Sequence, residues 1–452
     1  MEKRVGIYQN SPTYQLADEA LQKALILLGL PVENPLQELV RPGDCVLLKP
    51  NLIRESHLYK ENEWEQIVTH GTIIRSVVGL VVQALHGKGR IIIADGPQTD
   101  SDFPLICQRT GLKQFLNEFR SPGVSLELMD LRQEHWLQKE EIISQRICLP
   151  GDPLGYTQVD LKGASEFTTY QLNGHFYGAD YNIAETASFH RNGYHNYILC
   201  RTAMEADVII NLPKLKTHKK TGITLSLKNV VGVNGHRNCL PHHTIGTPDE
   251  MGDEFPTSQS LNKIQSRFNQ AFRRSLWRHG GLGGVWARKI KRLGKKIFGG
   301  SDQVVREGNW YGNDTAWRMV LDLNKVLFYY AGDGTLRKEP RRYLSIVDGI
   351  IAGEGDGPVA AEPKPAGLLV AGFNPVAVDT ACAVLMGFDY RKIPLLACAW
   401  KISNHPLADF HPSEIHFLSN MPYWNGKLED LERAPHLGFL PHFGWRGHIE
   451  RE

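Results

Sequence analysis

Lysine side chains crowd the segment that follows the apolar run at residues 208–210. Lys214 and Lys216 alternate with Leu215, so in extended backbone both point to one face, and His218 shares that face. Ammonium groups placed this close repel one another and lose hydration, which lowers the pKa of a buried lysine. We therefore predict that Lys214, Lys216 and His218 are catalytic, as acid–base groups, as a Schiff-base nucleophile or as electrostatic catalysts. Lys219 and Lys220, by contrast, are expected to remain in water.

Polar residues also follow other predicted strands. In an open parallel sheet the carboxyl ends of the strands share one edge, and ligands bind in the crevice at that edge. Lysines at a strand end, followed by a helix start, offer ammonium and backbone N–H groups to phosphate or carboxylate. The predicted substrate-binding residues are Lys49, Asn51, Asp95, Lys228, Asn229 and Asp379. For Asp379, which lies in a helix of small apolar residues, a solvated face is left open as the alternative.

Three carboxylates, Asp348, Glu354 and Asp356, are spaced by glycines in a predicted loop. Glycine lets the backbone come close, so these side chains are predicted to hold Mg²⁺ or Mn²⁺ against a phosphate, or to balance the lysines as counter-charge. Glycine-rich acidic turns without a metal are also common. The histidines match no established metal-ligand spacing.

Several functional classes are disfavoured. The seven cysteines contain no C-x-x-C pair, so we predict no iron–sulfur cluster and no zinc ribbon. The motifs of P-loop nucleotidases, Rossmann dehydrogenases, zincin proteases and serine hydrolases are missing from their required contexts. The start has no apolar signal-peptide region, and the longest apolar stretch is about half of the ~20 residues that a membrane span needs. These features predict a cytoplasmic protein.

The elements that must position these residues follow from hydrophobic periodicity. Short apolar runs alternate with helical patterns, which predicts an α/β fold with one or more mostly parallel sheets flanked by helices. We expect two lobes: an N-terminal α/β lobe at residues 1–170, and a C-terminal α/β lobe, carrying the lysine segment, at residues 171–235 and 310–403. Residues 404–452 are expected to form an irregular tail packed on the surface.

A basic insertion is predicted at residues 236–309, where the βα rhythm stops. From Lys263 to Lys296 the chain has eleven Lys or Arg and no Asp or Glu. Residues 285–298 place Trp286, Ile290 and Leu293 on one helical face and basic residues elsewhere, which is a basic amphipathic helix. Such a helix binds an anionic membrane surface or docks on the protein's own body, and both alternatives stay open. Nucleic acid is disfavoured because no known module is present.

The segment ADVIINLPKLKTHKKTGITLSLKNVVGVNG, at residues 206–235, resembles the signature of the domain-of-unknown-function 362 family. The runs VLLKPNL, ADGP, VDGIIAGEGDGP and NPVAVDTACAVLMGF also follow in the order of that family, so the resemblance covers roughly residues 40–100 and 185–390. Many members carry an added ferredoxin-like domain with C-x-x-C motifs, which this chain lacks. The resemblance supports as motif positions Lys49, Asn51, Lys214, Lys216, His218, Lys228, Asn229, Asp348, Glu354, Asp356 and Asp379, and it implies no particular reaction.

Together these features predict an enzyme that acts on an anionic substrate, a small molecule or one that is lipid-linked or glycan-related. A peripheral place at a membrane is the second part of this hypothesis, since it depends on the basic helix. The competing hypothesis is a non-catalytic protein that uses the same lysines to hold an anionic ligand or to act as a scaffold. No pattern in the sequence indicates an oligomeric state.

Overall fold

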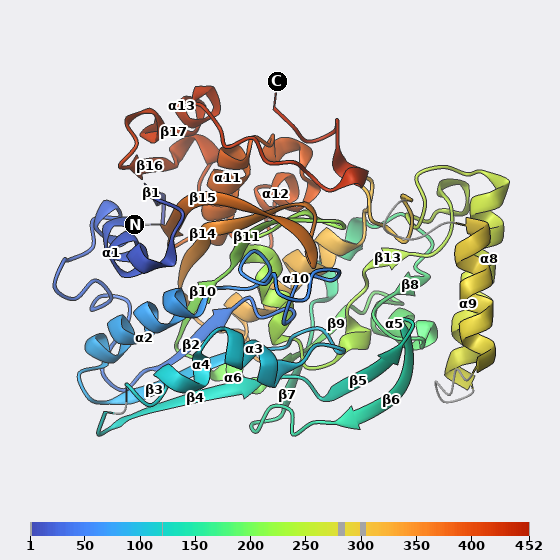
Figure 1. Cartoon of the computed structure of the whole chain (residues 1–452), viewed down its shortest axis with the longest axis horizontal. Coiled ribbons are helices and arrows are strands. Elements are labelled where there is room, and N and C mark those ends of the chain that lie inside the picture. Colours follow the sequence, from blue (N-terminus) through green and yellow to red (C-terminus); the bar gives the residue numbers. More distant parts are fainter. Residues whose placement is uncertain (1, 120, 279–284, 299–303, 452) are drawn as a thin grey trace.

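The computed structural model describes residues 2–119, 121–278, 285–298 and 304–451. Through them runs an 11-stranded sheet with the order β17-β16-β1-β15-β14-β10-β2-β3-β4, and β11 and β12 extend it beside β14 (Figure 1). Its strands are β1 (Arg4–Gln9), β2 (Cys45–Pro50), β3 (Gly89–Asp95), β4 (Val124–Asp130), β10 (Val208–Leu212), β11 (Lys214–His218), β12 (Gly222–Thr224), β14 (Arg342–Asp356), β15 (Ala360–Gly372), β16 (His416–Ser419) and β17 (Gly426–Lys427).

The sheet is mostly parallel, as predicted. Strands β4, β3, β2, β10 and β14 pair in parallel, whereas β15 runs antiparallel to both β14 and β1. The carboxyl ends of β2, β3 and β10 therefore meet at one edge, which brings the polar residues that follow them together. This arrangement is the basis of the candidate site.

Helices cover both faces of the sheet, and consecutive side chains of a strand enter different cores. In β2, for example, Val46 and Leu48 pack with α1 and α2, whereas Leu47 packs on the opposite face with α10 and α11. Strands that are buried on both faces read as continuous apolar runs, which explains why they were recognisable in the sequence. The helices are α1 (Ala17–Leu27), α2 (Gly71–Leu85), α3 (Phe103–Arg109), α4 (Leu112–Phe115), α5 (Ile183–Phe189), α6 (Arg201–Glu205), α7 (Ser226–Asn229), α8 (Ser260–Arg278), α9 (Val285–Phe298), α10 (Ala316–Tyr329), α11 (Pro375–Met386), α12 (Pro394–Ala399) and α13 (Leu428–Arg433).

Three two-stranded sheets lie outside the large sheet in the described residues. Four of their six strands fall in residues 133–185, where the sequence allows only a loose assignment. They pair β5 (Glu134–Lys139) with β6 (Ile142–Cys148), β7 (Tyr156–Asp160) with β9 (Asn196–Cys200), and β8 (Phe176–Tyr177) with β13 (His243–Thr244).

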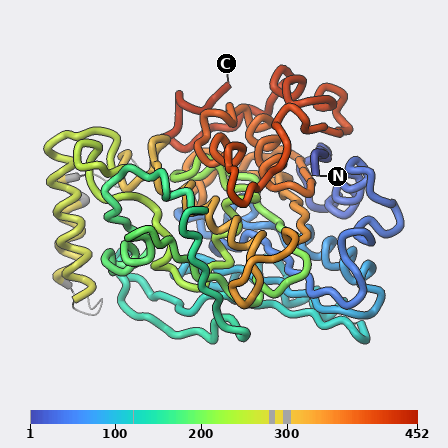
Figure 2. The backbone as a smooth tube through the Cα atoms, turned by 180° about the vertical axis from the view of Figure 1, so that it is seen from behind, coloured from blue at the N-terminus to red at the C-terminus, as the bar shows by residue number. Residues whose placement is uncertain are grey.

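The predicted division into two lobes is not seen in the sheet, because β2 of the first predicted lobe pairs directly with β10 of the second. The C-terminal segment also differs from the prediction of an irregular surface tail. Its strand β16 pairs in parallel with β1, and the side chain of Trp445 is fully buried. Figure 2, which shows the molecule from behind, places this red segment next to the N-terminus, in agreement with the pairing of β16 with β1.

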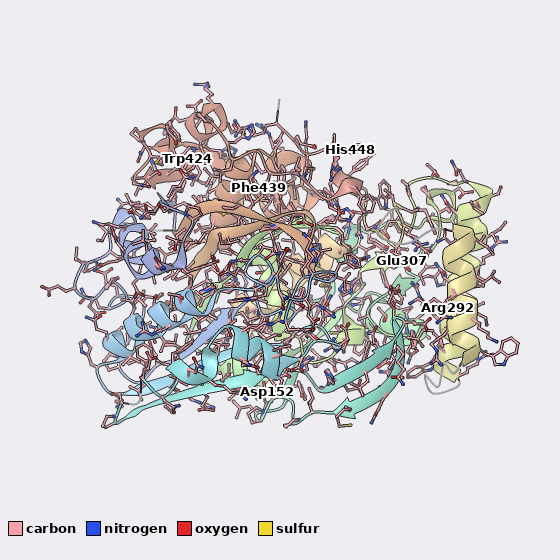
Figure 3. All side chains as sticks on the ribbon, in the orientation of Figure 1. Asp152, Arg292, Glu307, Trp424, Phe439 and His448 are labelled. Atoms are coloured by element: carbon pink, nitrogen blue, oxygen red, sulfur yellow. The ribbon has the colours of Figure 1, made fainter. Side chains whose placement is uncertain are left out.

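The region predicted as a basic insertion includes the helices α8 and α9, which stand at one edge of the molecule (Figures 1 and 2). We call this pair the basic hairpin. It is tied to the β5–β6 turn by ion pairs from Lys291 to Glu141, at 2.7 Å, and from Arg292 to Glu140, at 2.5 Å. Figure 3 labels Arg292 on α9 and Glu307 where the chain returns to the body. No helix among the described residues is long and apolar enough to cross a membrane.

Candidate functional site

A buried polar network joins the ends of β2 and β3. The ammonium group of Lys49 contacts Asp95 Oδ1 at 2.7 Å and donates to the carbonyl of Pro50 at 2.8 Å. The other carboxylate oxygen of Asp95 accepts the backbone N–H of Leu52 at 2.6 Å. Burial lowers the pKa of Lys49, and the carboxylate of Asp95 opposes that shift. Lys49 and Asp95 therefore form a closed ion pair that shapes the site rather than offering a free charge.

Two asparagine amides extend this network to the lysine segment. Asn51 Nδ2 donates to Asn229 Oδ1 at 3.0 Å, and Asn229 Nδ2 donates to the carbonyl of Lys49 at 3.0 Å. Asn51 Oδ1 in turn accepts from Lys216 Nζ at 3.0 Å. The structure thus brings together five residues that the sequence predicted for the site, and it places them as mutual hydrogen-bond partners.

Lys214 lies on β11 but does not reach a crevice. It is completely buried, and its Nζ contacts Asp348 Oδ2 at 2.9 Å and Tyr14 Oη at 2.7 Å. The backbone N–H of His70 donates to the same carboxylate. The prediction that Lys214 faces a ligand is therefore wrong: it is one half of a closed ion pair, and Asp348 is its partner.

Lys216 is also completely buried, but it faces no carboxylate. Its ammonium group is held by Asn51 Oδ1 and by the carbonyl of Ile67. Burial, and secondarily the charge of Lys214, holds the pKa of Lys216 well below the ordinary value of 10.5. Lys216 is absent from the lining of the cavity described next, and it reaches that cavity through its hydrogen bond to Asn51 and through its charge, which helps to lower the pKa of His218.

A cavity of about 270 Å³ lies beside the network. Five predicted residues line it: Asn51, Asp95, His218, Lys228 and Asn229. Its other polar lining residues include Arg237, His242, Lys219, Lys220 and Asp100. The two carboxylates of this lining are already paired, Asp95 with Lys49 at 2.7 Å and Asp100 with Arg54 at 2.9 Å. Cations therefore dominate the free charge of the cavity.

Lys228 and Arg237 are the half-buried cations of this lining that have no partner among the described residues, whereas Lys219 is exposed and Lys220 donates to the carbonyl of Glu307. Neither Lys228 nor Arg237 makes a hydrogen bond or an ion pair with any residue in the part of the chain that the structure describes. Burial, with a contribution from Lys49, lowers the pKa of Lys228 to about 8. Burial, with a contribution from Arg132, lowers the pKa of Arg237 to about 10. A half-buried cation that lacks a counter-charge is costly, and an anionic ligand would supply that charge.

Two histidines present complementary hydrogen-bonding groups to the cavity. His218 Nδ1 accepts the backbone N–H groups of Lys220, at 3.1 Å, and Thr221, at 3.3 Å. With Nδ1 occupied as an acceptor, the neutral ring carries its proton on Nε2. Burial and neighbouring lysines, Lys228 foremost, hold the pKa of His218 well below 6.5. His218 is therefore a neutral N–H donor, and the acid–base role predicted for it does not fit this geometry.

His242 has the opposite tautomer. Its Nδ1 lies 2.8 Å from the carbonyl of Leu240, which can only accept, so Nδ1 carries the proton and Nε2 keeps a lone pair. Burial and the charge of Lys228 lower the pKa of His242 to about 3. Besides its cations, the lining thus offers one neutral N–H donor, His218, and one neutral acceptor, His242.

Glycine is required at one point of the cavity wall. A Cβ atom on Gly232 would lie 1.9 Å from Asp95 Oδ1 and 2.7 Å from Lys49 Nζ. The carbonyl of Gly232 also accepts the backbone N–H of Gly96 at 2.7 Å. The backbone after α7 therefore packs directly against the Lys49–Asp95 pair.

Asp379 is buried and positions α7, so the alternative of a solvated face is wrong. Its two carboxylate oxygens accept the backbone N–H groups of Ser226, at 2.8 Å, and Leu227, at 2.9 Å. These are orphan donors at the start of α7, the short helix that carries Lys228 and Asn229. Burial raises the pKa of Asp379 to about 7, against the effect of these N–H groups. Asp379 thus acts on the cavity indirectly.

The three carboxylates predicted to bind metal do not meet. All lie on β14, and Asp348 and Asp356 are separated by about 26 Å of extended strand. Glu354 forms an ion pair with Lys364 at 3.3 Å, and Asp356 accepts the backbone N–H of Phe443 at 3.4 Å. Among the described residues, no group of three or more His, Cys, Asp or Glu side chains is placed to hold a metal ion. The predicted loop is instead a paired strand.

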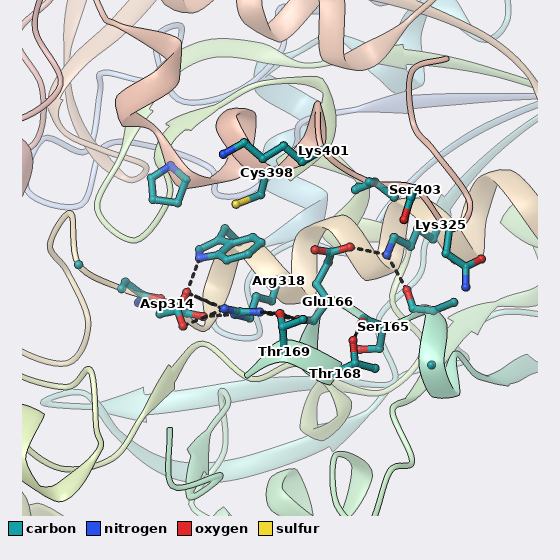
Figure 4. A pocket seen from close by; sticks show the side chains of 18 of the residues that line it. Ser165, Glu166, Thr168, Thr169, Asp314, Arg318, Lys325, Cys398, Lys401 and Ser403 are labelled. Atoms are coloured by element: carbon teal, nitrogen blue, oxygen red, sulfur yellow. Dashed lines mark hydrogen bonds and ion pairs between the residues drawn. The ribbon is translucent and has the colours of Figure 1, made fainter. Parts of the chain in front are cut away.

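A larger cavity of about 630 Å³ lies between α10 and the segment after α12 (Figure 4). Four of its charged side chains are paired with one another: Lys325 contacts Glu166 at 2.5 Å and Arg318 contacts Asp314 at 3.0 Å. Lys401, at the exposed rim, is in no ion pair with a described residue. This pairing leaves little free charge for a ligand. The smaller cavity, with its unpaired cations, is the better candidate for a functional site.

Sequence reasoning missed Arg237 and His242 and misplaced Lys220. Arg237 and His242 fall just inside the predicted insertion, so they were separated from the lysine segment that they adjoin in space. The signal that could have found them is the glycine pair at Gly232 and Gly235, which marks a close turn before a second polar cluster. Lys220, expected in water, is bonded to the carbonyl of Glu307, whereas Lys219 is exposed as predicted.

A comparison against protein families matches most of this chain. The model described as Domain of unknown function (DUF362) matches residues 46–152 and 163–384. This chain belongs to that family. The match confirms the resemblance drawn from the lysine segment, and the DUF362 region contains every residue that lines the candidate cavity.

Two further similarities place this DUF362 protein among known proteins. It is 23% identical over 369 residues to the "Thylakoid-associated protein sll1697" of Synechocystis sp. (strain ATCC 27184 / PCC 6803 / Kazusa), which covers 82% of this chain and 71% of that protein. A crystal structure of a protein from Thermotoga maritima aligns with 83% of this chain and 60% of its own chain, at 11% identity and a TM-score of 0.32. The latter similarity is too low to show a shared fold.

Proposed function

We propose that the cavity binds a small molecule bearing a phosphate or carboxylate group, and that this DUF362 protein is an enzyme acting on that molecule. The observation that carries the proposal is the pair of half-buried cations, Lys228 and Arg237, without an anionic partner among the described residues. A volume of about 270 Å³ suits a small ligand or a headgroup rather than a large cofactor.

The chemistry that fits the lining is electrostatic stabilisation. Lys228, Arg237 and the Nε2–H of His218 would bind an anionic group and stabilise negative charge that develops on one of its oxygens. The lone pair of His242 Nε2 would accept a hydroxyl or N–H of the same ligand. This set favours a ligand that carries both an anionic group and a hydroxyl, such as a polyol phosphate or a hydroxy acid.

The alternative is a protein that binds such a ligand without converting it. One observation favours this alternative: the potential proton acceptors in the lining are engaged or weak. Asp95 and Asp100 are held in ion pairs, and His242 has a pKa of about 3. In the enzyme hypothesis, proton transfer would therefore fall to Lys228 or to the ligand itself.

The place of action proposed for this chain is a membrane surface. Its relative from Synechocystis bears the name "Thylakoid-associated protein sll1697", and none of the described helices could span a bilayer. Association would therefore be peripheral. A lipid-linked or glycan-related intermediate with an anionic headgroup is the substrate class that joins this location to the cationic cavity.

Isothermal titration with inorganic phosphate, sulfate and citrate tests the anion site. Lys228→Met is expected to weaken binding roughly tenfold or more, because it removes a charge-assisted hydrogen bond. Lys338→Met, which removes an exposed lysine outside the cavity, is the matched control and should bind as the wild type does. Equal affinity of the wild type and Lys228→Met would overturn the proposed site.

Turnover separates the two functions. Wild type, His218→Gln and His218→Ala are compared on a set of phosphomonoesters of polyols and on hydroxy acids. The glutamine variant can keep an N–H donor, so under the enzyme hypothesis it should retain more activity than the alanine variant. Binding by the wild type without conversion of any compound, together with loss of binding in Lys228→Met, would support the binding protein instead.

A further inference from the structure

The basic hairpin exposes an unusual amount of apolar surface. On α9, the side chains of Trp286, Leu293 and Ile297 are between 58% and 80% exposed, and on α8 those of Leu261 and Ile264 are 53% and 58% exposed. Large apolar side chains scattered singly are normal on a surface, but a contiguous group marks a binding face. We call these five residues the hairpin apolar face.

The spacing and contacts of the two helices make this face continuous. Trp286, Leu293 and Ile297 follow at i, i+7 and i+11 and so form one stripe along α9. The contact between α9 and α8 lies next to that stripe. Gly294, which follows Leu293, faces α8, because a Cβ atom on it would lie 3.4 Å from the ring of Phe268. On α8, Ile264 and Leu261 lie one and two turns before Phe268, on the same side of the helix.

The face points away from the protein body. Lys291, which is bound to Glu141 of the β5–β6 turn, lies two residues before Leu293, and two residues correspond to about 200° around a helix. The ion pair of Arg292 with Glu140 holds the same side of α9 on the body. The stripe is therefore on the opposite side from these tethers. A small buried cluster of Ala287, Leu276 and Ile142 lies between the two helices and the body.

Charge indicates what covers the face. Between Phe255 and Ser301 the sequence contains eleven Lys or Arg and no Asp or Glu. Arg274, Arg278, Arg288 and Lys289 are in no ion pair with a described residue, so their charge is available to a partner. An apolar stripe flanked by cations complements the interface of a bilayer that contains anionic lipid. Two copies of this face would bring many like charges together, which disfavours self-association.

We propose that the hairpin apolar face docks the protein on an anionic membrane, with Trp286, Leu293 and Ile297 entering the headgroup boundary. This inference deepens the peripheral location proposed above and specifies its surface. The hairpin also contacts the wall of the cavity: Arg273 of α8 binds Glu307 at 2.9 Å, and the carbonyl of Glu307 accepts from Lys220, which lines the cavity. Docking would hold the anion site beside the membrane, where lipid-linked headgroups lie.

The test is co-sedimentation of the full chain with vesicles of phosphatidylcholine alone or mixed in equal parts with phosphatidylglycerol. The wild type should sediment with the mixed vesicles only. The partition of Trp286→Ser/Leu293→Ser/Ile297→Ser onto the mixed vesicles should be roughly tenfold or more weaker than that of the wild type. The partition of Arg288→Glu/Lys289→Glu should weaken by roughly fivefold or more for each cation replaced. A control, Val32→Ser/Leu336→Ser, removes apolar side chains of similar exposure elsewhere and should sediment as the wild type does.

Sulfate titration of the same proteins keeps the two proposals separate. The hairpin variants should bind sulfate as the wild type does, and Lys228→Met should lose sulfate binding but still sediment. Docking on a membrane is overturned if the wild type stays in solution, or if the hairpin variants sediment unchanged. Self-association would replace it if light scattering shows that the wild type is a dimer and that only the apolar variant is a monomer. RNA binding would replace it if the wild type binds RNA but not vesicles, and only the charge variant fails to bind RNA.

Discussion

Lys228 differs from the other lysines of its segment in what surrounds its ammonium group. Lys214 has Asp348 at 2.9 Å, and Lys216 has the carbonyl of Ile67 and the amide oxygen of Asn51. Lys228 lines the cavity without such a partner among the described residues. Its desolvation is therefore uncompensated in the free protein, and its pKa falls to about 8.

This environment predicts how anion binding depends on pH. Sulfate keeps its charge across the neutral and alkaline range, so changes in its affinity report the protein. Lys228 attracts the anion only while it is protonated. The affinity should therefore fall as pH rises through about 8, by up to tenfold per pH unit. Titration calorimetry at several pH values measures this loss.

The variant Lys228→Met is the control for that dependence. Lys220 also lines the cavity, and burial lowers its pKa to about 7, so a smaller loss near that pH belongs to Lys220. In Lys228→Met the loss of sulfate affinity near pH 8 should vanish, while the smaller loss near pH 7 should remain. An unchanged pH profile in the variant would contradict the assignment of the loss near pH 8 to Lys228.

The residue types of the site were predictable, and their partners were not. The sequence predicts Lys214, Lys216 and His218 on one face of a strand; all three lie on β11 and are buried, yet only His218 reaches the cavity. Which lysine is paired depends on Tyr14 and Asp348, which lie 200 and 134 residues away along the chain. Local spacing carries no information about such long-range partners.

The short helix α7 depends on an anchor from another element. It has only four residues, too few to be stable alone, and the carboxylate of Asp379 in α11 accepts both of its first N–H groups. Lys228 and Asn229 both belong to α7. The position of the cation in the cavity is therefore set by a residue on a different helix.

Replacement of this anchor tests that dependence. Asp379→Asn keeps the size but offers one oxygen for two N–H groups, so the free energy of unfolding should fall by about 1–3 kcal/mol. Sulfate binding should weaken as well, because α7 is no longer held in place. Urea unfolding and calorimetry measure the two effects. Asp409→Asn, an exposed aspartate, should change neither; normal stability in Asp379→Asn would show that α7 needs no anchor.

The strand β14 shows why the end of a strand can be predicted wrongly from the sequence. The apolar run at residues 343–351 predicted a strand, and the following glycines and acidic residues predicted a loop. The strand instead continues to Asp356 because β15 pairs with it as far as Ala360. Pairing with a neighbour overrode the weak β-propensity of glycine, aspartate and glutamate.

Across the whole molecule, the order of strands explains both the success and the limit of the sequence prediction. Continuous apolar runs identified most central strands, and the rule that ligands lie at carboxyl ends directed attention to the edge where the candidate cavity lies. Strand order depends on pairings between distant segments, such as β2 with β10 and β1 with β16, so the expected lobes merged into one sheet. The C-terminal segment belongs to this sheet as well.

That segment also closes over the lysine loop. Trp445 donates through Nε1 to the carbonyl of Lys219 at 2.8 Å, and its ring lies against Gly222, where a Cβ atom would be 3.1 Å away. Glu354 and Asp356, predicted as metal ligands, instead accept backbone N–H groups of the same segment. The end of the chain thus supports the loop that holds His218 in its tautomer.

Trp445→Ala should therefore affect both stability and the site. Removal of a fully buried tryptophan is expected to lower the free energy of unfolding by about 3–5 kcal/mol, and sulfate affinity should fall because the loop of Lys219 and Lys220 loses its cover. Trp445→Phe keeps most of the packing and loses one hydrogen bond, so its cost should be about 1 kcal/mol. Urea unfolding with parallel calorimetry compares the variants. If Trp445→Ala unfolds at the same urea concentration as the exposed-site control Tyr423→Ala, the C-terminal segment does not support the fold.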